Sequence, residues 1–245
     1  MRPGLRPDSQ VTDVVSNTTA THALRASGIK KAYRSPNGLL EVLTGVDLEV
    51  ARGTILAIVG ASGAGKSTLL NILGTLDHPD TGTVEIGGLR VDHLKDRELA
   101  RIRATRLGFV FQFHHLLPEF SAEENVMMPM LIAGSEPGAA RARAREALTA
   151  VGLKERWLHR PAELSGGEAQ RVAVARALAP SPELVLADEP SGNLDTGAAS
   201  ALHELIGTLA REQHQTFVVV THNDRLAERA DRVLTLESGR LVARP

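Results

Sequence analysis

The glycine-rich stretch from Gly60 to Ser67 has the clearest chemical use in this 245-residue chain. Its spacing matches the P-loop pattern, in which backbone amides at a helix start surround phosphate oxygens. Apolar runs predict a buried strand over 54–59 and a helix over 66–76, and this context favours phosphate binding over an ordinary glycine-rich turn. We expect Lys66 to reach the β- and γ-phosphates of a nucleotide and the Ser67 hydroxyl to ligate Mg²⁺. The residues expected to surround the phosphates are Gly60, Ala61, Ser62, Gly63, Ala64, Gly65, Lys66, Ser67 and Thr68.

Two adjacent carboxylates, Asp188 and Glu189, follow the apolar run Leu184-Val-Leu-Ala. A buried strand that ends here would hold Asp188 near the P-loop, where its carboxylate orients the Mg²⁺ shell. Glu189 would then polarise the attacking water as a general base. An Asp-Glu-Pro sequence is also a common start of a turn or helix, but the P-loop upstream favours the catalytic interpretation.

A second anion-attracting helix start is predicted at Leu164-Ser-Gly-Gly-Glu168. Ser165 fits the N-cap position, and the free amides of the first turn attract anions. A plain capped helix fits the same residues. Spacing alone does not explain why a chain with a P-loop would need this second site.

The order of these stretches along the chain points to a family. Together with Gln112 after an apolar run and with Val220-Thr-His222, the set is similar to that of the nucleotide-binding subunits of ABC (ATP-binding cassette) transporters. The resemblance runs from about Leu24 to the carboxyl end, and it implies an enzyme that hydrolyses ATP to ADP and phosphate with Mg²⁺. One departure is Ser191, which stands where threonine is more usual and keeps the hydroxyl.

The resemblance implies that the ATP site is shared by two subunits. The stretch at Ser165 resembles the signature motif, so Ser165, Gly166 and Gly167 would contact the γ-phosphate held by the opposite subunit of a head-to-tail homodimer. Asp195 resembles the D-loop aspartate that crosses to the partner subunit.

Three further residues gain a role from the resemblance, although a structural role is the alternative for each. Gln112 is similar to the Q-loop glutamine, which senses Mg²⁺ and water. His222 is similar to the switch histidine that bonds the γ-phosphate. Tyr33, the only tyrosine, matches the position of an aromatic residue that stacks on adenine. The resemblance therefore implies catalytic Glu189, His222 and Gln112, and a metal site of Ser67, Gln112 and Asp188.

The pattern of apolar residues predicts an α/β fold. Strand-like runs around turns near the amino end predict a small antiparallel lobe, and later strands that alternate with helices predict a parallel sheet covered by helices. The expected strands are 24–33, 39–50, 54–59, 83–86, 90–91, 184–187, 217–221 and 233–236, with helices over 168–179 and 197–212.

Residues 113–164 have a different character, with helical segments around 123–132 and 138–151. We expect the P-loop NTPase fold of ABC ATPases, with a parallel core sheet, an antiparallel β lobe and this stretch as an inserted helical subdomain. Residues 1–22 lack apolar periodicity and are predicted to be a disordered tail, so that the domain covers 23–245.

Composition narrows the classes of function. Hydrophobic residues make up 42% and charged residues 23%, as in ordinary globular proteins, and the net charge is −1. No long-range field therefore draws the chain to nucleic acid, which disfavours an ATPase that works on nucleic acid or ribosomes. The absence of cysteine excludes disulfides and thiolate metal sites. No apolar run approaches the ~20 residues that cross a bilayer, so membrane subunits would have to hold the chain at a membrane.

Within the ABC family, the segments 112–129 and 187–195 look closest to the ATPase of lipoprotein-releasing systems. This resemblance implies a peripheral ATPase on the cytoplasmic face of the bacterial inner membrane, paired with integral membrane subunits like LolC and LolE that extract lipoproteins toward the outer membrane. Near relatives leave alternatives open. One is a regulatory ATPase like FtsE of cell division, and another is the ATPase of a macrolide or peptide exporter.

The apolar residues between Phe113 and Met130 predict a docking surface for such a membrane partner. Pro118 and Pro129 are expected to interrupt the helices, so that one helix face cannot bury every apolar side chain. We expect Leu116 and Met128 to point outward. The alternative is that these side chains are buried in the core of the helical subdomain.

Overall fold

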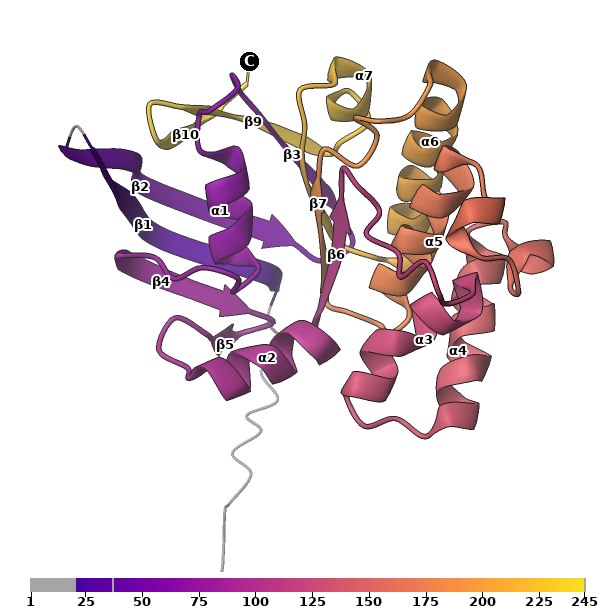
Figure 1. Ribbon diagram of the computed structural model, residues 1–245. Coiled ribbons are helices and arrows are strands. Elements are labelled where there is room, and N and C mark those ends of the chain that lie inside the picture. Colours follow the sequence, from indigo (N-terminus) through magenta and orange to yellow (C-terminus); the bar gives the residue numbers. More distant parts are fainter. Residues whose placement is uncertain (1–20, 37, 245) are drawn as a thin grey trace, which may run out of the picture.

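The computed structural model describes residues 21–36 and 38–244 (Figure 1). The predicted tail, 1–22, therefore lies outside the described residues except for Thr21 and His22. His22 already belongs to the first strand, β1 (His22–Ser35).

Near the amino end, β1 and β2 (Gly38–Ala51) form a long antiparallel hairpin. β4 (Thr81–Ile86) pairs with the other edge of β1, and β5 (Leu89–Arg90) pairs with β4, so the order within the described chain is β2-β1-β4-β5. The predicted antiparallel lobe is thus present.

The central sheet has the order β10-β9-β3-β8-β7-β6 among the described strands. All its neighbours are parallel except β10 and β9, which form a hairpin. Two of these strands, β6 and β10, were not predicted from the sequence. Their bounds and those of the others are β3 (Ile55–Val59), β6 (Leu107–Phe111), β7 (Leu184–Asp188), β8 (Phe217–Val220), β9 (Arg232–Glu237) and β10 (Arg240–Ala243).

Helices cover both faces of the central sheet (Figure 1). α1 (Lys66–Leu73) packs between the two sheets, whereas α5 (Gly166–Leu178) and α6 (Thr196–Gln213) cover the opposite face. The alternation of side chains along a strand explains the two layers, because Val185 and Ala187 face one hydrophobic cluster and Leu184 and Leu186 face the other. The remaining helices are α2 (Asp96–Thr105), α3 (Ala122–Ile132), α4 (Pro137–Ala150) and α7 (Asp224–Ala227), with short 3₁₀ helices at Lys154–Arg156 and Pro161–Glu163.

The structure corrects two expectations about the segment 113–130. Pro129 lies inside α3 and does not end it. Leu116 is only 8% exposed and belongs to the core, because the loop after β6 turns it under α3, whereas its neighbour Leu117 is 40% exposed. The described helices include none that is both long and apolar enough to cross a bilayer.

Candidate nucleotide-binding and hydrolysis site

A pocket of about 510 Å³ opens where β3 and β7 end, beside the antiparallel sheet. The carboxyl ends of parallel strands are the usual place for a ligand in open α/β sheets. Most of the predicted site residues lie together here. Val42 of β2, which was not predicted, also lines the pocket. The pocket is lined by Tyr33, Val42, Ser62, Gly63, Gly65, Lys66, Ser67, Thr68, Gln112, Asp188, Glu189 and His222.

The P-loop connects β3 to α1 in the predicted manner. Gly65 caps α1 with φ 97°, and a Cβ atom there would lie 2.7 Å from Cγ1 of Val42, so only glycine fits. The ammonium group of Lys66 donates to the carbonyl oxygens of Gly60 and Ala61, each at 2.9 Å. This lysine therefore lies folded across the loop, with its charge at the pocket wall.

Asp188 ends β7 directly opposite the P-loop and shares a hydrogen bond with Ser67. Burial raises the pKa of this carboxyl group, and the neighbouring charge of Glu189 raises it further, while Ser67 and Lys66 act in the opposite direction. The predicted metal-site residues Ser67, Asp188 and Gln112 all line the same pocket.

Glu189 and His222 come from the ends of two adjacent parallel strands and touch. Nδ1 of His222 lies 2.7 Å from Oε1 of Glu189, and Oε2 accepts from the Thr221 hydroxyl at 3.1 Å. Glu189 has φ 46°, a left-handed conformation that a residue with a side chain seldom adopts and that recurs at functional sites. No pattern in the sequence indicates this conformation.

Gln112 follows β6 and is bound to the segment after β7. Its side-chain nitrogen donates to Oδ1 of Asn193 at 3.0 Å, and the side-chain nitrogen of Asn193 donates to the Gln112 carbonyl at 3.2 Å. The parallel pairing of β6 with β7 brings these two loops together. Asn193 was not predicted, because an isolated asparagine in a loop has no pattern.

The residues predicted to act across a dimer lie outside this pocket. Ser165 caps α5 by accepting from the Glu168 amide, and Glu168 in turn accepts from the amide of Ser165. The Nε atom of Arg156 lies 2.9 Å from Oε1 of Glu168. The hydrogen bonds to Ser165 and this ion pair lower the pKa of Glu168 to about 2. Gly166 and Gly167 form the first turn of α5. The Asp195 carboxylate accepts from the amides of Gly197 and Ala198, and so caps α6.

Tyr33 stands at the open edge of the pocket and is 40% exposed. Its hydroxyl donates to Asp77 at 2.7 Å, and the ammonium group of Lys31 lies 5.2 Å from the ring centre. These contacts fix the orientation of an aromatic face that is open to a ligand.

Comparisons with known proteins agree with this site. Residues 43–192 match the sequence profile described as ABC transporter. The chain belongs to the ABC transporter family. The resemblance stated from the sequence is therefore confirmed, together with the α/β fold and the expectation that this ABC protein is an ATPase.

Among the relatives, a protein of Geobacter metallireducens named "Lipoprotein-releasing system ATP-binding protein LolD" is 54% identical over 90% of this ABC chain and 98% of its own length. A protein of the same name from Bacteroides fragilis is 52% identical over 89% of the chain and all of its own length.

Solved ABC cassettes have the same fold. The dimeric structure of a bacterial ABC transporter cassette matches with a TM-score of 0.80 and 39% identity, covering 89% of this chain and 96% of that one. The dimeric structure of a post-hydrolysis state of such a cassette, bound to ADP and Pi, matches with a TM-score of 0.80 and 38% identity. It also covers 89% of this chain and 96% of that one.

Proposed function

We propose that this chain is the ATP-hydrolysing subunit of a lipoprotein-releasing transporter, peripheral to the cytoplasmic face of the bacterial inner membrane. The hydrolytic part rests on one observation: Lys66 of the P-loop and the Glu189–His222 pair line a single pocket. The lipoprotein-releasing part is supported by the names of relatives that match nearly end to end.

Hydrolysis follows from the positions of the pocket residues. Phosphates bound by the P-loop amides lie over the start of α1, and Lys66 leaves its carbonyl partners to pair with their charge. Glu189 is fixed by Thr221 and His222, so its carboxylate can accept the proton of a water that attacks the terminal phosphate. His222 is exposed toward the pocket and donates to the phosphate oxygen.

The residues beside the P-loop fit Mg²⁺. Ser67, Asp188 and Gln112 offer hydroxyl, carboxylate and amide oxygens, which are the hard ligands this ion prefers. The described residues contain no cluster of three or more acidic, histidine or cysteine side chains that would hold a metal alone. Such an incomplete set suits Mg²⁺, which in nucleotide sites keeps water and phosphate ligands and there neutralises phosphate charge.

We propose further that two copies of the chain form the complete site. Ser165, Gly166 and Gly167 lie outside the pocket of their own chain, although the helix start they form suits an anion. A head-to-tail dimer would bring them to the partner's phosphates. The dimeric form of the similar cassette supports this arrangement.

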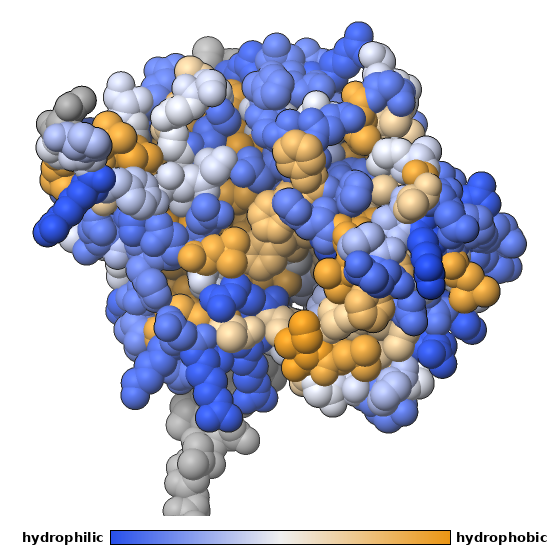
Figure 2. Space-filling model, in the orientation of Figure 1, coloured by the Kyte–Doolittle hydropathy of each residue, from blue (hydrophilic) through white to orange (hydrophobic). Residues whose placement is uncertain are grey.

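A separate apolar groove of about 370 Å³ supports a membrane partner. It lies between α2 and α3, where Figure 2 shows apolar side chains gathered on the surface. Arg103 and Arg176 also line the groove, and the guanidinium of Arg176 donates to the carbonyls of His114 and His115. The apolar residues that line the groove are Leu76, Ala100, Ala104, Phe109, Phe111, Leu117, Met128, Pro129 and Ile132.

We assign this groove to a short amphipathic helix from the cytoplasmic side of a transporter subunit like LolC or LolE. The apolar lining accepts the apolar face of such a helix, and the two arginines favour an acidic residue on it. Gln112 connects the groove to the nucleotide pocket, because it lines the pocket and its chain neighbour Phe111 lines the groove.

Purification of the tagged chain from its native membranes, with mass identification of the proteins that accompany it, tests the proposal. Two integral membrane subunits that bind lipoproteins are the expected result. A cell-division protein or a drug-exporter subunit would instead support the regulatory or exporter alternative.

A further inference from the structure

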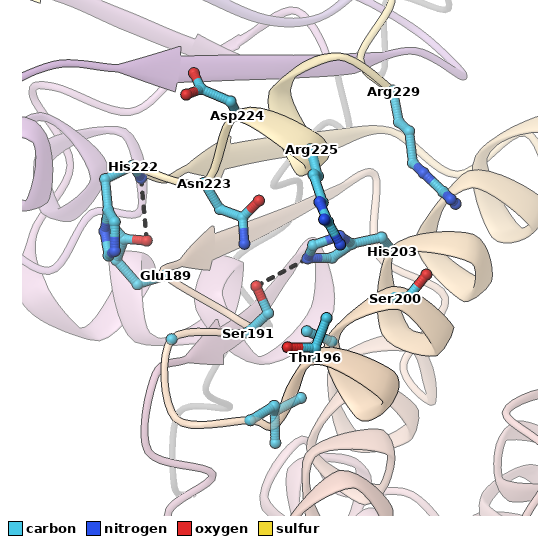
Figure 3. A pocket seen from close by; sticks show the side chains of 13 residues that line it. Glu189, Ser191, Thr196, Ser200, His203, His222, Asn223, Asp224, Arg225 and Arg229 are labelled. Carbon is cyan, nitrogen blue, oxygen red and sulfur yellow. Dashed lines mark hydrogen bonds and ion pairs between the residues drawn. The ribbon is translucent and has the colours of Figure 1, made fainter.

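A second polar cavity, of about 390 Å³, lies directly behind the hydrolytic pair (Figure 3). Glu189 and His222 line both this cavity and the nucleotide pocket, so the two spaces share a wall. The segment 191–196, α6 and α7 supply the other sides. None of the roles described above uses His203, Arg225 or Arg229.

The buried end of the cavity is polar. His203 is 3% exposed and Ser191 is 6% exposed, and Nε2 of His203 lies 2.8 Å from the Ser191 hydroxyl. Burial lowers the pKa of His203, and the positive charges of Arg229 and Arg225 lower it further. The lowered pKa favours the neutral imidazole, which offers a hydrogen bond without a charge of its own. Thr196, Ser200 and Asn223 add further donors to the lining.

Two arginines supply positive charge at the other end. Arg225 reaches from α7 toward His203 and Ser191 (Figure 3). Within the described residues, its guanidinium has no hydrogen-bond or ion-pair partner. In the part of the chain that the structure describes, the Arg229 guanidinium has one ion-pair contact, a long one of 3.4 Å with Glu204. These guanidinium groups thus have donors available for a ligand.

The carboxylates of the lining do not cancel this charge. Asp224 points away from Ser191 and His203 in Figure 3 and pairs with Arg244 at 3.2 Å. Glu189 is held by Thr221 and His222 at the wall shared with the nucleotide pocket. The space between them presents hydroxyl, amide, imidazole and guanidinium donors, which together suit a small tetrahedral oxyanion.

We propose that this cavity binds the inorganic phosphate produced by hydrolysis, after it has passed Glu189 and His222 from the nucleotide pocket. The inference rests on the proposed hydrolysis at Glu189 and adds a binding site to it. Arg225 and Arg229 hold the phosphate, and Ser191 and His203 close the inner end.

Binding of radiolabelled inorganic phosphate, measured by equilibrium dialysis, tests this site. The full chain is first loaded with Mg²⁺, ADP and beryllium fluoride, which fills the terminal-phosphate position of the nucleotide pocket. We expect one further phosphate per chain. The variant Arg225→Gln/Arg229→Gln should bind it about tenfold more weakly or worse, since charge-assisted hydrogen bonds are lost. Arg211→Gln is the matched control, because Arg211 is exposed on α6 outside the cavity lining.

If the double variant does not fold, Arg225→Gln alone is tested, because the Arg225 side chain is exposed and makes no hydrogen bond or ion pair within the described residues. Equal phosphate binding by the parent chain and the arginine variants would overturn the proposal, as would the absence of any phosphate beyond the nucleotide pocket. ATP turnover of the parent chain is measured on the same preparation. Turnover without the extra phosphate site refutes only the cavity, whereas a chain without turnover refutes the proposed hydrolysis.

Discussion

Glu189 and His222 form a pair at 2.7 Å although their positions lie 33 apart in the chain, and Glu189 has a left-handed backbone conformation. The adjacent parallel strands β7 and β8 end at the same level and bring the two residues together. The carboxylate therefore has a fixed direction, as a general base requires.

Glu189→Gln should keep ATP binding and lower the hydrolysis rate by about a hundredfold or more, because the amide cannot take a proton from water. ATP should then hold a stable dimer, visible by size-exclusion chromatography. Lys66→Ala, which removes a phosphate contact, should instead weaken ATP binding itself. A single-turnover rate of Glu189→Gln close to that of the parent chain would remove Glu189 from this role.

Mixing two inactive variants tests the shared site. A Lys66→Ala chain and a Gly166→Asp chain should each be inactive alone and regain ATPase activity when combined, because the mixed dimer has one site with both parts intact. Gly166→Asp should fold, since a Cβ atom there would meet only Cδ2 of Leu194 at 3.9 Å. If each site were contained within one chain, the mixture would stay inactive.

The groove between α2 and α3 makes Leu117 and Met128 the residues to change, and not Leu116. Leu117→Gln and Met128→Gln should weaken binding of the membrane subunits about tenfold, through lost apolar contact, while basal ATPase activity persists. Leu131→Gln is the control, because Leu131 is exposed on α3 outside the groove. Pull-down and phosphate release are measured on each variant, and unchanged pull-down in both groove variants would place docking elsewhere.

The ionisation of Glu168 should make the free energy of unfolding of the chain depend on pH. Its pKa falls from 4.5 to about 2 on folding, so the ionised carboxylate stabilises the folded state above pH 4.5, and this contribution is lost as the pH falls toward 2. Glu168→Gln should therefore lower the free energy of unfolding by about 1–2 kcal/mol at pH 7. Urea titrations at pH 7 and pH 3 check this, and an equal deficit at both values would contradict it.

Tyr33→Ala should weaken ATP binding about tenfold, and Tyr33→Phe much less, since stacking needs only the ring face. Fluorescent-nucleotide titration distinguishes the two. Equal loss in both variants would show that the hydroxyl bond to Asp77 matters more than the ring.

The sequence was most informative where chemistry and periodicity coincide. The P-loop stands between a buried strand and a helix, and that pattern predicted both neighbours correctly. α2 was missed because only Leu99 and Ile102 of its ten residues are buried, which leaves little periodicity. β10 at the sheet edge also has almost no buried residues. The outward or inward direction of Leu116 depends on how α3 packs over its loop, which no local pattern contains.

The hydrogen bonds between Gln112 and Asn193 have a consequence for how the parts of the chain communicate. The side-chain nitrogen of Gln112 donates to Asn193, and within the described residues the amide oxygen accepts no hydrogen bond, while the residue lines the nucleotide pocket. The Gln112 side chain can therefore contact the 191–195 loop through its nitrogen and the nucleotide through its oxygen. A displacement of the 191–195 loop by a second copy would turn the amide oxygen, and a pull from the groove beyond Leu117 would do the same from the other side. The amide oxygen of Gln112 would then be correctly oriented only when a second copy contacts the 191–195 loop and a partner occupies the groove.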